Sequence, residues 1–146
     1  TRRQRQMCIR DRGKLDYLGE IRQYVKSAAK EAGLEKKASY NLCLAVDEIA
    51  TNIITHGYDD NGLEGNIYVQ TEIDEKSLTV YIEDTAIPFD PKTKEAVTQE
   101  DLQKSLEERP IGGLGIHLVY ESVDEFIYEY KGDRNRNILV VNRITT

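Results

Sequence analysis

Long hydrophobic runs are absent from this 146-residue sequence, and cysteine is scarce. No apolar stretch approaches the ~18 residues that a membrane-spanning helix needs, and no signal-peptide pattern opens the chain. The two cysteines, Cys8 and Cys43, lie in a polar N-terminal stretch and in an apolar segment, which argues against a structural disulfide or a zinc site. We therefore expect a cytoplasmic protein without membrane contact.

A continuous basic stripe is also missing. The net charge is -6, yet residues 1–12 contain five arginines and one aspartate, so the rest of the chain carries about -10. An acidic body of this kind argues against nucleic-acid binding. We expect residues 1–13 to be an arginine-rich leader that is disordered or artefactual, and residues 14–146 to form a single domain, which is large enough to bury a real core.

Proline is scarce and confined to one segment. All three prolines lie within residues 87–110, where regular secondary structure is expected to pause. Compact domains seldom tolerate such a long irregular segment without a purpose, and a lid over a ligand is the usual one. We therefore expect this segment to cover a bound ligand.

Hydrophobic periodicity elsewhere alternates between helical and strand spacing. Apolar residues three or four apart predict helices over about 16–33, 36–56 and 113–122. Alternation with period two predicts strands at 67–73, 78–84, 124–130 and 135–144, with turns at 74–76 and 131–133. Gly57 is expected to end the second helix in the left-handed conformation. The order of these elements predicts an α+β fold, a two-layer α/β sandwich whose mostly antiparallel sheet carries helices on one face.

Polar residues on the apolar second helix give the first indication of a site. Glu48 and Asn52 lie one turn apart, so their side chains project from the same helix face. A carboxylate on a helix this apolar is costly to bury unless something pairs with it, and a Mg-bound nucleotide would supply such a partner. His56 extends the same face and could contact a phosphate or only cap the helix end. Taken singly, a helical Glu is usually solvated, and a buried Asn often bridges backbone groups.

A strand end and a glycine cluster supply further candidates. Asp84 ends the second predicted strand, where its ordinary role would be to begin a turn. The third predicted helix opens with the glycine cluster, which consists of Gly112, Gly113, Leu114 and Gly115. A backbone without bulky side chains can approach phosphates closely there, although a glycine cluster alone is also typical of a linker. The order and spacing of all these candidates are the stronger signal.

Together these blocks resemble the GHKL (Bergerat-fold) ATP-binding family, and within it the bacterial anti-sigma regulatory factors of partner-switching systems, which are serine/threonine kinases. Residues 45–58 resemble the N box of the family, residues 84–91 its first glycine box and residues 109–119 its second. The first box departs from the usual Asp-x-Gly-x-Gly pattern because Ala86 and Pro88 stand at the glycine positions. This form resembles a variant found within the anti-sigma subfamily.

The resemblance implies a role for each candidate. Asp84 would accept a hydrogen bond from the adenine amino group of ATP, with Ala86 beside it in the first glycine box. Asn52 would ligate Mg, and Glu48 would take the proton from an attacking hydroxyl of a protein serine or of water. His56 and the glycine cluster would complete the nucleotide site, the cluster through backbone N–H groups and the helix N-terminus.

Two functions stay open on these grounds. In the first, the chain is an ATP-binding anti-sigma regulatory factor that phosphorylates a small antagonist protein and sequesters a sigma factor. In the second, it is an ATP- or ADP-dependent protein-binding switch without significant kinase activity. A sensor histidine kinase is disfavoured because no phospho-accepting hairpin precedes the domain. The resemblance thus implies an antagonist protein and a sigma factor as partners, and a homodimer formed through the sheet or the first helix.

Overall fold

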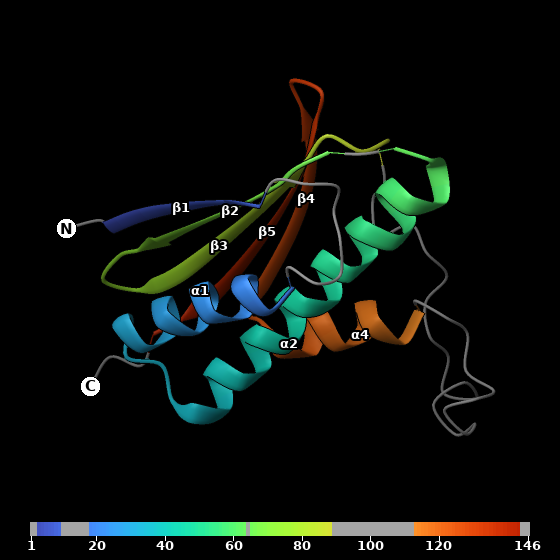
Figure 1. Ribbon diagram of the computed structural model, residues 1–146. Helices are drawn as coiled ribbons and strands as arrows, with labels where there is room; N and C mark the ends of the chain where they lie inside the picture. The colour runs from blue at the N-terminus through green and yellow to red at the C-terminus, as the bar shows by residue number, and fades with distance from the viewer. Residues whose placement is uncertain (1–2, 10–17, 64, 89–112, 144–146) are drawn as a thin grey trace.

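The computed structural model describes residues 3–9, 18–63, 65–88 and 113–143. Its α-helices are α1 (Leu18–Glu31), α2 (Lys36–Asn52) and α4 (Gly113–Ser122). Its strands are β1 (Arg3–Ile9), β2 (Ile67–Ile73), β3 (Ser77–Asp84), β4 (Glu125–Lys131) and β5 (Arg134–Asn142). The strands form one antiparallel sheet in the order β1-β2-β3-β5-β4, and the helices cover one of its faces (Figure 1). The predicted α+β two-layer sandwich is confirmed.

Strand alternation decides which side chains face the helices. Buried and less buried residues alternate along β2, β3 and β5, as expected for strands with one face on the core. The core between sheet and helices is built from aliphatic side chains, including Ile21, Val46, Ile49, Val80 and Leu139. Within the described ranges, no helix is long and apolar enough to span a membrane.

The N-terminal stretch differs from the expectation. Arg3–Ile9 forms the edge strand β1, whose seven residues pair with β2 from Arg3 opposite Ile73 to Ile9 opposite Ile67. The expectation of a disordered leader is therefore wrong for these residues. The physical reason is that β2 presents a row of backbone N–H and C=O groups at the sheet edge, and a nearby segment can pair with them whatever its net charge.

The second helix also continues further than predicted. Beyond α2 the backbone runs through a π-helical turn, η2 (Ile53–Tyr58), and a 3-10 turn, η3 (Asp59–Asn61). Gly62, with φ 64°, adopts the left-handed conformation, and the prediction that Gly57 ends the helix in this way is wrong. Glycine suits position 57 for a different reason: a Cβ there would lie only 3.0 Å from the Cβ of Ala86, which is a tight contact. The loop after β3 thus packs directly against the helix backbone.

The two predicted hairpin turns are confirmed. Asp74 Oδ1 accepts hydrogen bonds from the backbone N–H groups of Lys76 and Ser77, both at 2.8 Å. Gly132 and Asp133 have φ angles of 59° and 64°, which suit a two-residue turn between β4 and β5. These turns set the registers of both hairpins and so determine which residues lie opposite each other at the strand ends.

Candidate nucleotide-binding site

A small pocket lies between the C-terminal part of α2 and the adjoining ends of β3 and β5. Its lining residues are Ile49, Asn52, Ile53, Gly57, Asp84, Ala86, Ile87, Asn135 and Asn137. Three of the residues predicted from the sequence to bind nucleotide, Asn52, Asp84 and Ala86, are thus brought into one pocket. Antiparallel pairing of β3 with β5 sets Asp84 directly opposite Asn135, at one end of the mostly apolar sheet face.

Two polar atoms on the pocket wall are buried and have no hydrogen-bond partner among the described residues. They are Asn52 Nδ2 and Asn137 Oδ1. The residues are only 6% and 2% exposed, and an unpaired buried polar group costs ~1–3 kcal/mol. One atom is a donor and the other an acceptor, so a polar ligand or ordered water that offers both functions would satisfy them together.

Asp84 is the ionisable group among the described residues that line the pocket. It is 2% exposed, and burial raises its pKa to about 6 although two hydrogen bonds act in the opposite direction. Both bonds reach the same oxygen, because Ala86 N donates to Oδ1 at 3.0 Å and Asn135 Nδ2 donates to Oδ1 at 2.9 Å. Oδ2 is therefore the oxygen that can accept a hydrogen bond from a ligand, such as an amino group.

Tyr58, the last residue of η2, holds the end of β3 in place. Its hydroxyl donates to the carbonyl of Asn66 at 2.7 Å and accepts from the backbone N–H of Thr85 at 2.9 Å. Gly65 packs against the ring so closely that a Cβ there would lie 2.6 Å from it. The helical extension beyond Asn52 and the backbone just beyond Asp84 are thus joined by one buried side chain.

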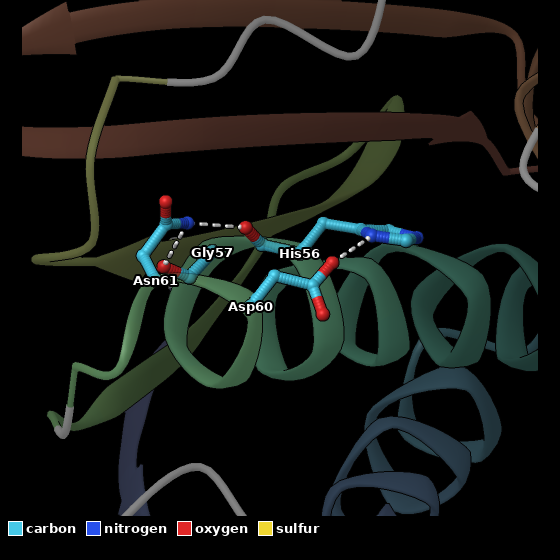
Figure 2. Close-up of polar contacts among 4 residues, drawn as sticks. All are labelled: His56, Gly57, Asp60 and Asn61. Atoms are coloured by element: carbon cyan, nitrogen blue, oxygen red, sulfur yellow. Dashed lines mark hydrogen bonds and ion pairs between the residues drawn. The ribbon is translucent and has the colours of Figure 1, made fainter.

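Glu48 and His56 lie outside the pocket lining. Glu48 is partly exposed on α2, one turn before Asn52. His56 Nδ1 pairs with Asp60 Oδ2 at 2.8 Å, next to Asn61, whose Nδ2 donates to the carbonyls of His56 at 2.8 Å and Gly57 at 3.2 Å (Figure 2). These contacts agree with the ordinary role of His56 at a helix end, and its contact with phosphate stays a prediction.

The predicted start of the third helix is confirmed in part. Gly113, Leu114 and Gly115 form the first turn of α4, whereas Gly112 lies outside the described residues. Helix α4 lies beside α2, and its first turn lies toward the end of the molecule where α2 continues as η2 (Figure 1). The predicted lid, residues 87–110, also lies outside the described residues except for its first two positions.

The donor set of the pocket suits a magnesium ion only in company with a nucleotide. The described residues contain no group of three or more His, Cys, Asp or Glu side chains that could hold a metal ion. The buried side-chain amide of Asn52 offers one oxygen of the kind that Mg²⁺ prefers. The remaining ligands would have to be phosphate oxygens and water, as is usual when Mg²⁺ binds with ATP.

Asn135 and Asn137 are pocket residues that the sequence analysis missed. They alternate along β5 in phase with Leu139 and Val141, on the face that the helices bury. Asparagine is usually exposed, so two asparagines at inward positions of a strand are an informative signal. The strand pattern alone could have drawn attention to them.

Fold and pocket together define a class, that of two-layer α/β sandwich domains with a polar pocket between a helix that carries Asn52 and a strand that ends at Asp84. A comparison with protein families matches residues 8–142 to the histidine kinase-like ATPase domain. The chain belongs to this family.

Similar proteins narrow the class further. Serine-protein kinase RsbW of Listeria monocytogenes serovar 1/2a is 31% identical over 113 residues, which are 77% of this chain and 71% of that protein. Serine-protein kinase RsbW of Bacillus thuringiensis (strain Al Hakam) is 27% identical over 113 residues, 77% of this chain and 69% of that protein. The predicted resemblance to anti-sigma serine kinases is confirmed.

Two solved structures share the fold. The RsbU and RsbW domains of Rv1364c from Mycobacterium tuberculosis match 97% of this chain with a TM-score of 0.61 and 14% identity. The chain spans 35% of that longer structure. The histidine kinase domain of a blue-light-activated kinase from Erythrobacter litoralis matches 88% of this chain, and 60% of its own length, with a TM-score of 0.54 and 16% identity.

Proposed function

We propose that this chain is an ATP-binding anti-sigma regulatory factor that transfers the γ-phosphate of ATP to a serine of a small antagonist protein. The observation that carries the proposal is the pocket that joins Asn52 and Asp84 in a chain similar to serine-protein kinases. The unpaired atoms of Asn52 and Asn137 and the oriented carboxylate of Asp84 are the features that a purine nucleotide would use.

Asp84 is the residue that would recognise adenine. Its Oδ2 would accept a hydrogen bond from the exocyclic amino group, while Oδ1 stays bound to Asn135 and to the backbone of Ala86. Guanine carries a carbonyl oxygen at the same position and would face the carboxylate with a second acceptor. The site therefore favours ATP over GTP.

Glu48 and Asn52 are the residues that would support phosphoryl transfer. Mg²⁺, when bound, would neutralise negative charge on the phosphates, and Asn52 would help to hold it there. Glu48, one turn away and partly exposed, would accept the proton of the incoming serine hydroxyl. The serine oxygen then forms a bond to the γ-phosphorus as the bond to the β,γ-bridging oxygen breaks, and ADP leaves.

A binding switch without catalysis is the alternative function. Such a switch would need the nucleotide pocket but no general base, and Glu48 would then be an ordinary helix residue. The similarity to proteins named serine-protein kinases favours the kinase. As partners we propose an antagonist protein that carries the acceptor serine, a sigma factor that competes with it, and a second copy of this chain.

The kinase assignment can be tested by mapping phosphosites. The purified chain would be incubated with ATP, Mg²⁺ and the proteins that it captures from its native host, and phosphoserine would be located by mass spectrometry. We expect phosphoserine on a small captured protein, and a sigma factor among the other captured proteins. Intact ATP binding without transfer to any serine would contradict the kinase and support the switch.

The pocket also predicts a pH dependence. Asp84 must be ionised to accept the adenine amino group, and its pKa is raised to about 6, so affinity should fall as the pH drops through this value. Each pH unit below the pKa removes up to ~10-fold of the ionised fraction, so we expect ATP to bind about 10-fold more weakly at pH 5 than at pH 7.5. Calorimetric titration across this range measures the effect. GTP is the control, because it shares the titrating phosphates but not the contact with Asp84, and an ATP-to-GTP affinity ratio that does not change with pH would contradict the role of Asp84.

A further inference from the structure

Asn135 makes a dense set of contacts at the floor of the pocket. Its Nδ2 donates to Asp84 Oδ1 at 2.9 Å, to the carbonyl of Ala86 at 3.2 Å and to the carbonyl of Ile87 at 3.0 Å. Its Oδ1 accepts a hydrogen bond from the hydroxyl of Tyr128 on the neighbouring strand β4. The residue is only 2% exposed, so water competes little for these contacts.

These contacts determine the orientation of the Asn135 amide. Three oxygen acceptors surround Nδ2, and a reversed amide would turn Oδ1 toward all three. Oxygen facing oxygen without a hydrogen between them is repulsive, so only one orientation satisfies the group. The side chain is thus a fixed donor that joins β5 to the end of β3 and to the turn that follows it.

The acceptors of Asn135 belong to the part of the pocket that would meet adenine. Asp84 supplies the carboxylate, and Ala86 supplies the N–H that binds the same carboxylate oxygen at 3.0 Å. With Oδ1 bound from two sides, rotation of the carboxylate is restrained and Oδ2 keeps one direction. Ala86 and Pro88 allow fewer backbone conformations than glycine would. The hydrogen bonds from Asn135 to the carbonyls of Ala86 and Ile87 stabilise the turn that contains them.

We propose that Asn135 is a positioning residue for purine selection: it holds the Asp84 carboxylate and the adjoining turn in the arrangement that accepts adenine and rejects guanine. The inference rests on the proposed function, because it assigns Asn135 a role in the same nucleotide site. Asn135 acts through Asp84 and has no role in binding the phosphates. Its loss therefore lowers the affinity for ATP more than the affinity for GTP.

The test compares three variants by calorimetric titration with MgATP and MgGTP at pH 7.5. Asn135→Ala removes every contact of the amide and should weaken ATP binding ~10-fold while GTP binding changes little, a loss typical of one hydrogen bond to a charged group. Tyr128→Phe removes only the hydroxyl that binds Asn135 Oδ1 and should reduce the ATP preference ~2- to 3-fold. Asn142→Ala alters an exposed asparagine on the same strand and should leave both affinities unchanged.

The outcomes separate this inference from the proposed function. A fall in the ATP-to-GTP affinity ratio in Asn135→Ala, with a smaller fall in Tyr128→Phe, supports the positioning role. An equal loss of affinity for both nucleotides would reveal a purely structural residue and overturn the inference. If Asn135→Ala does not fold, an unchanged ratio in Tyr128→Phe overturns it. A parental protein that binds neither nucleotide would overturn the proposed function itself, whereas parental selectivity that survives in the Asn135 variant overturns only the inference.

Discussion

Replacing Asp84 with asparagine is expected to weaken ATP binding and, at the same time, to stabilise the protein without ligand. The binding loss has two causes. The negative charge is lost, and the side-chain NH₂ of the new asparagine takes the place of Oδ2 if Oδ1 keeps its bonds to Asn135 and Ala86. This NH₂ is a donor and would face the amino group of adenine, which is also a donor. Losing a hydrogen bond to a charged acceptor costs ~1.5–3 kcal/mol, or about 10- to 100-fold in affinity.

The gain in stability follows from the raised pKa of Asp84. Burial lifts this pKa from 3.8 to about 6, so the folded state holds the proton more tightly than the unfolded chain does. The ionised carboxylate therefore destabilises the fold above pH 6, and this cost disappears at pH values below the unfolded pKa. A difference of roughly two pKa units corresponds to ~3 kcal/mol at most. We expect the D84N variant to exceed the parent in free energy of unfolding by ~1–3 kcal/mol at pH 7.5, with the gap closing near pH 4.

Both effects can be measured on the same preparations. Urea denaturation without nucleotide, at pH 7.5 and pH 4, gives the free energy of unfolding, and calorimetry with MgATP gives the affinity. Glu75→Gln is the matched control, because it neutralises an exposed carboxylate in the β2–β3 turn and should change neither quantity. A D84N variant that unfolds more easily than the parent at pH 7.5, or that binds ATP as tightly, would contradict the role of a buried carboxylate with a raised pKa.

Replacing Glu48 with glutamine should separate nucleotide binding from phosphoryl transfer. The carboxamide has nearly the same size and still forms hydrogen bonds, but it cannot accept a proton from the serine hydroxyl. General-base catalysis contributes ~10²–10⁴-fold, so we expect the rate of γ-phosphate transfer to fall by at least ~10²-fold. ATP affinity should stay within about twofold of the parent, because the residue lies outside the pocket lining.

Two further variants make this result specific. Asn52→Ala should instead weaken Mg-dependent ATP binding, since Asn52 lies on the pocket wall and would ligate the ion. Glu35→Gln, an exposed substitution just before α2, should leave both binding and transfer unchanged. Rates come from single-turnover transfer of labelled phosphate to the antagonist, and affinities from calorimetry. Transfer by the E48Q variant at the parental rate would remove Glu48 from the role of general base.

Much of the candidate nucleotide site could be predicted from local sequence because its residues lie on regular elements. The period of the apolar residues located the strand at 67–73, and this range coincides with β2. The same periodicity predicted the helix that carries Glu48 and Asn52 and the strand that ends at Asp84. Side-chain direction follows directly from the helical and strand periods. The face of the helix or strand on which each of these residues lies could therefore be predicted without the tertiary structure.

Other parts of the site depend on contacts between distant segments. Asn135 becomes a partner of Asp84 only because β5 pairs antiparallel with β3, and the register that joins them spans 51 residues of sequence. No local pattern encodes that register. The role of Tyr58 likewise arises where η2 meets the backbone at Asn66 and Thr85.

The sequence by itself determined most of the element types and the two-layer sandwich, because these follow from short-range periodicity, and the family resemblance pointed to Asn52 and Asp84, which the structure brings into one pocket. Only the tertiary structure decided that Arg3–Ile9 would pair with β2, that the second helix would pass through Gly57, and that Asn135 would hold Asp84. In each of these cases the deciding energy comes from partners far away in sequence. A sheet edge offers hydrogen bonds to a nearby strand, and the loop at Ala86 packs so tightly on the helix that a Cβ at Gly57 would lie only 3.0 Å from the Cβ of Ala86. A buried carboxylate is stabilised by any hydrogen-bond donor that the fold places beside it.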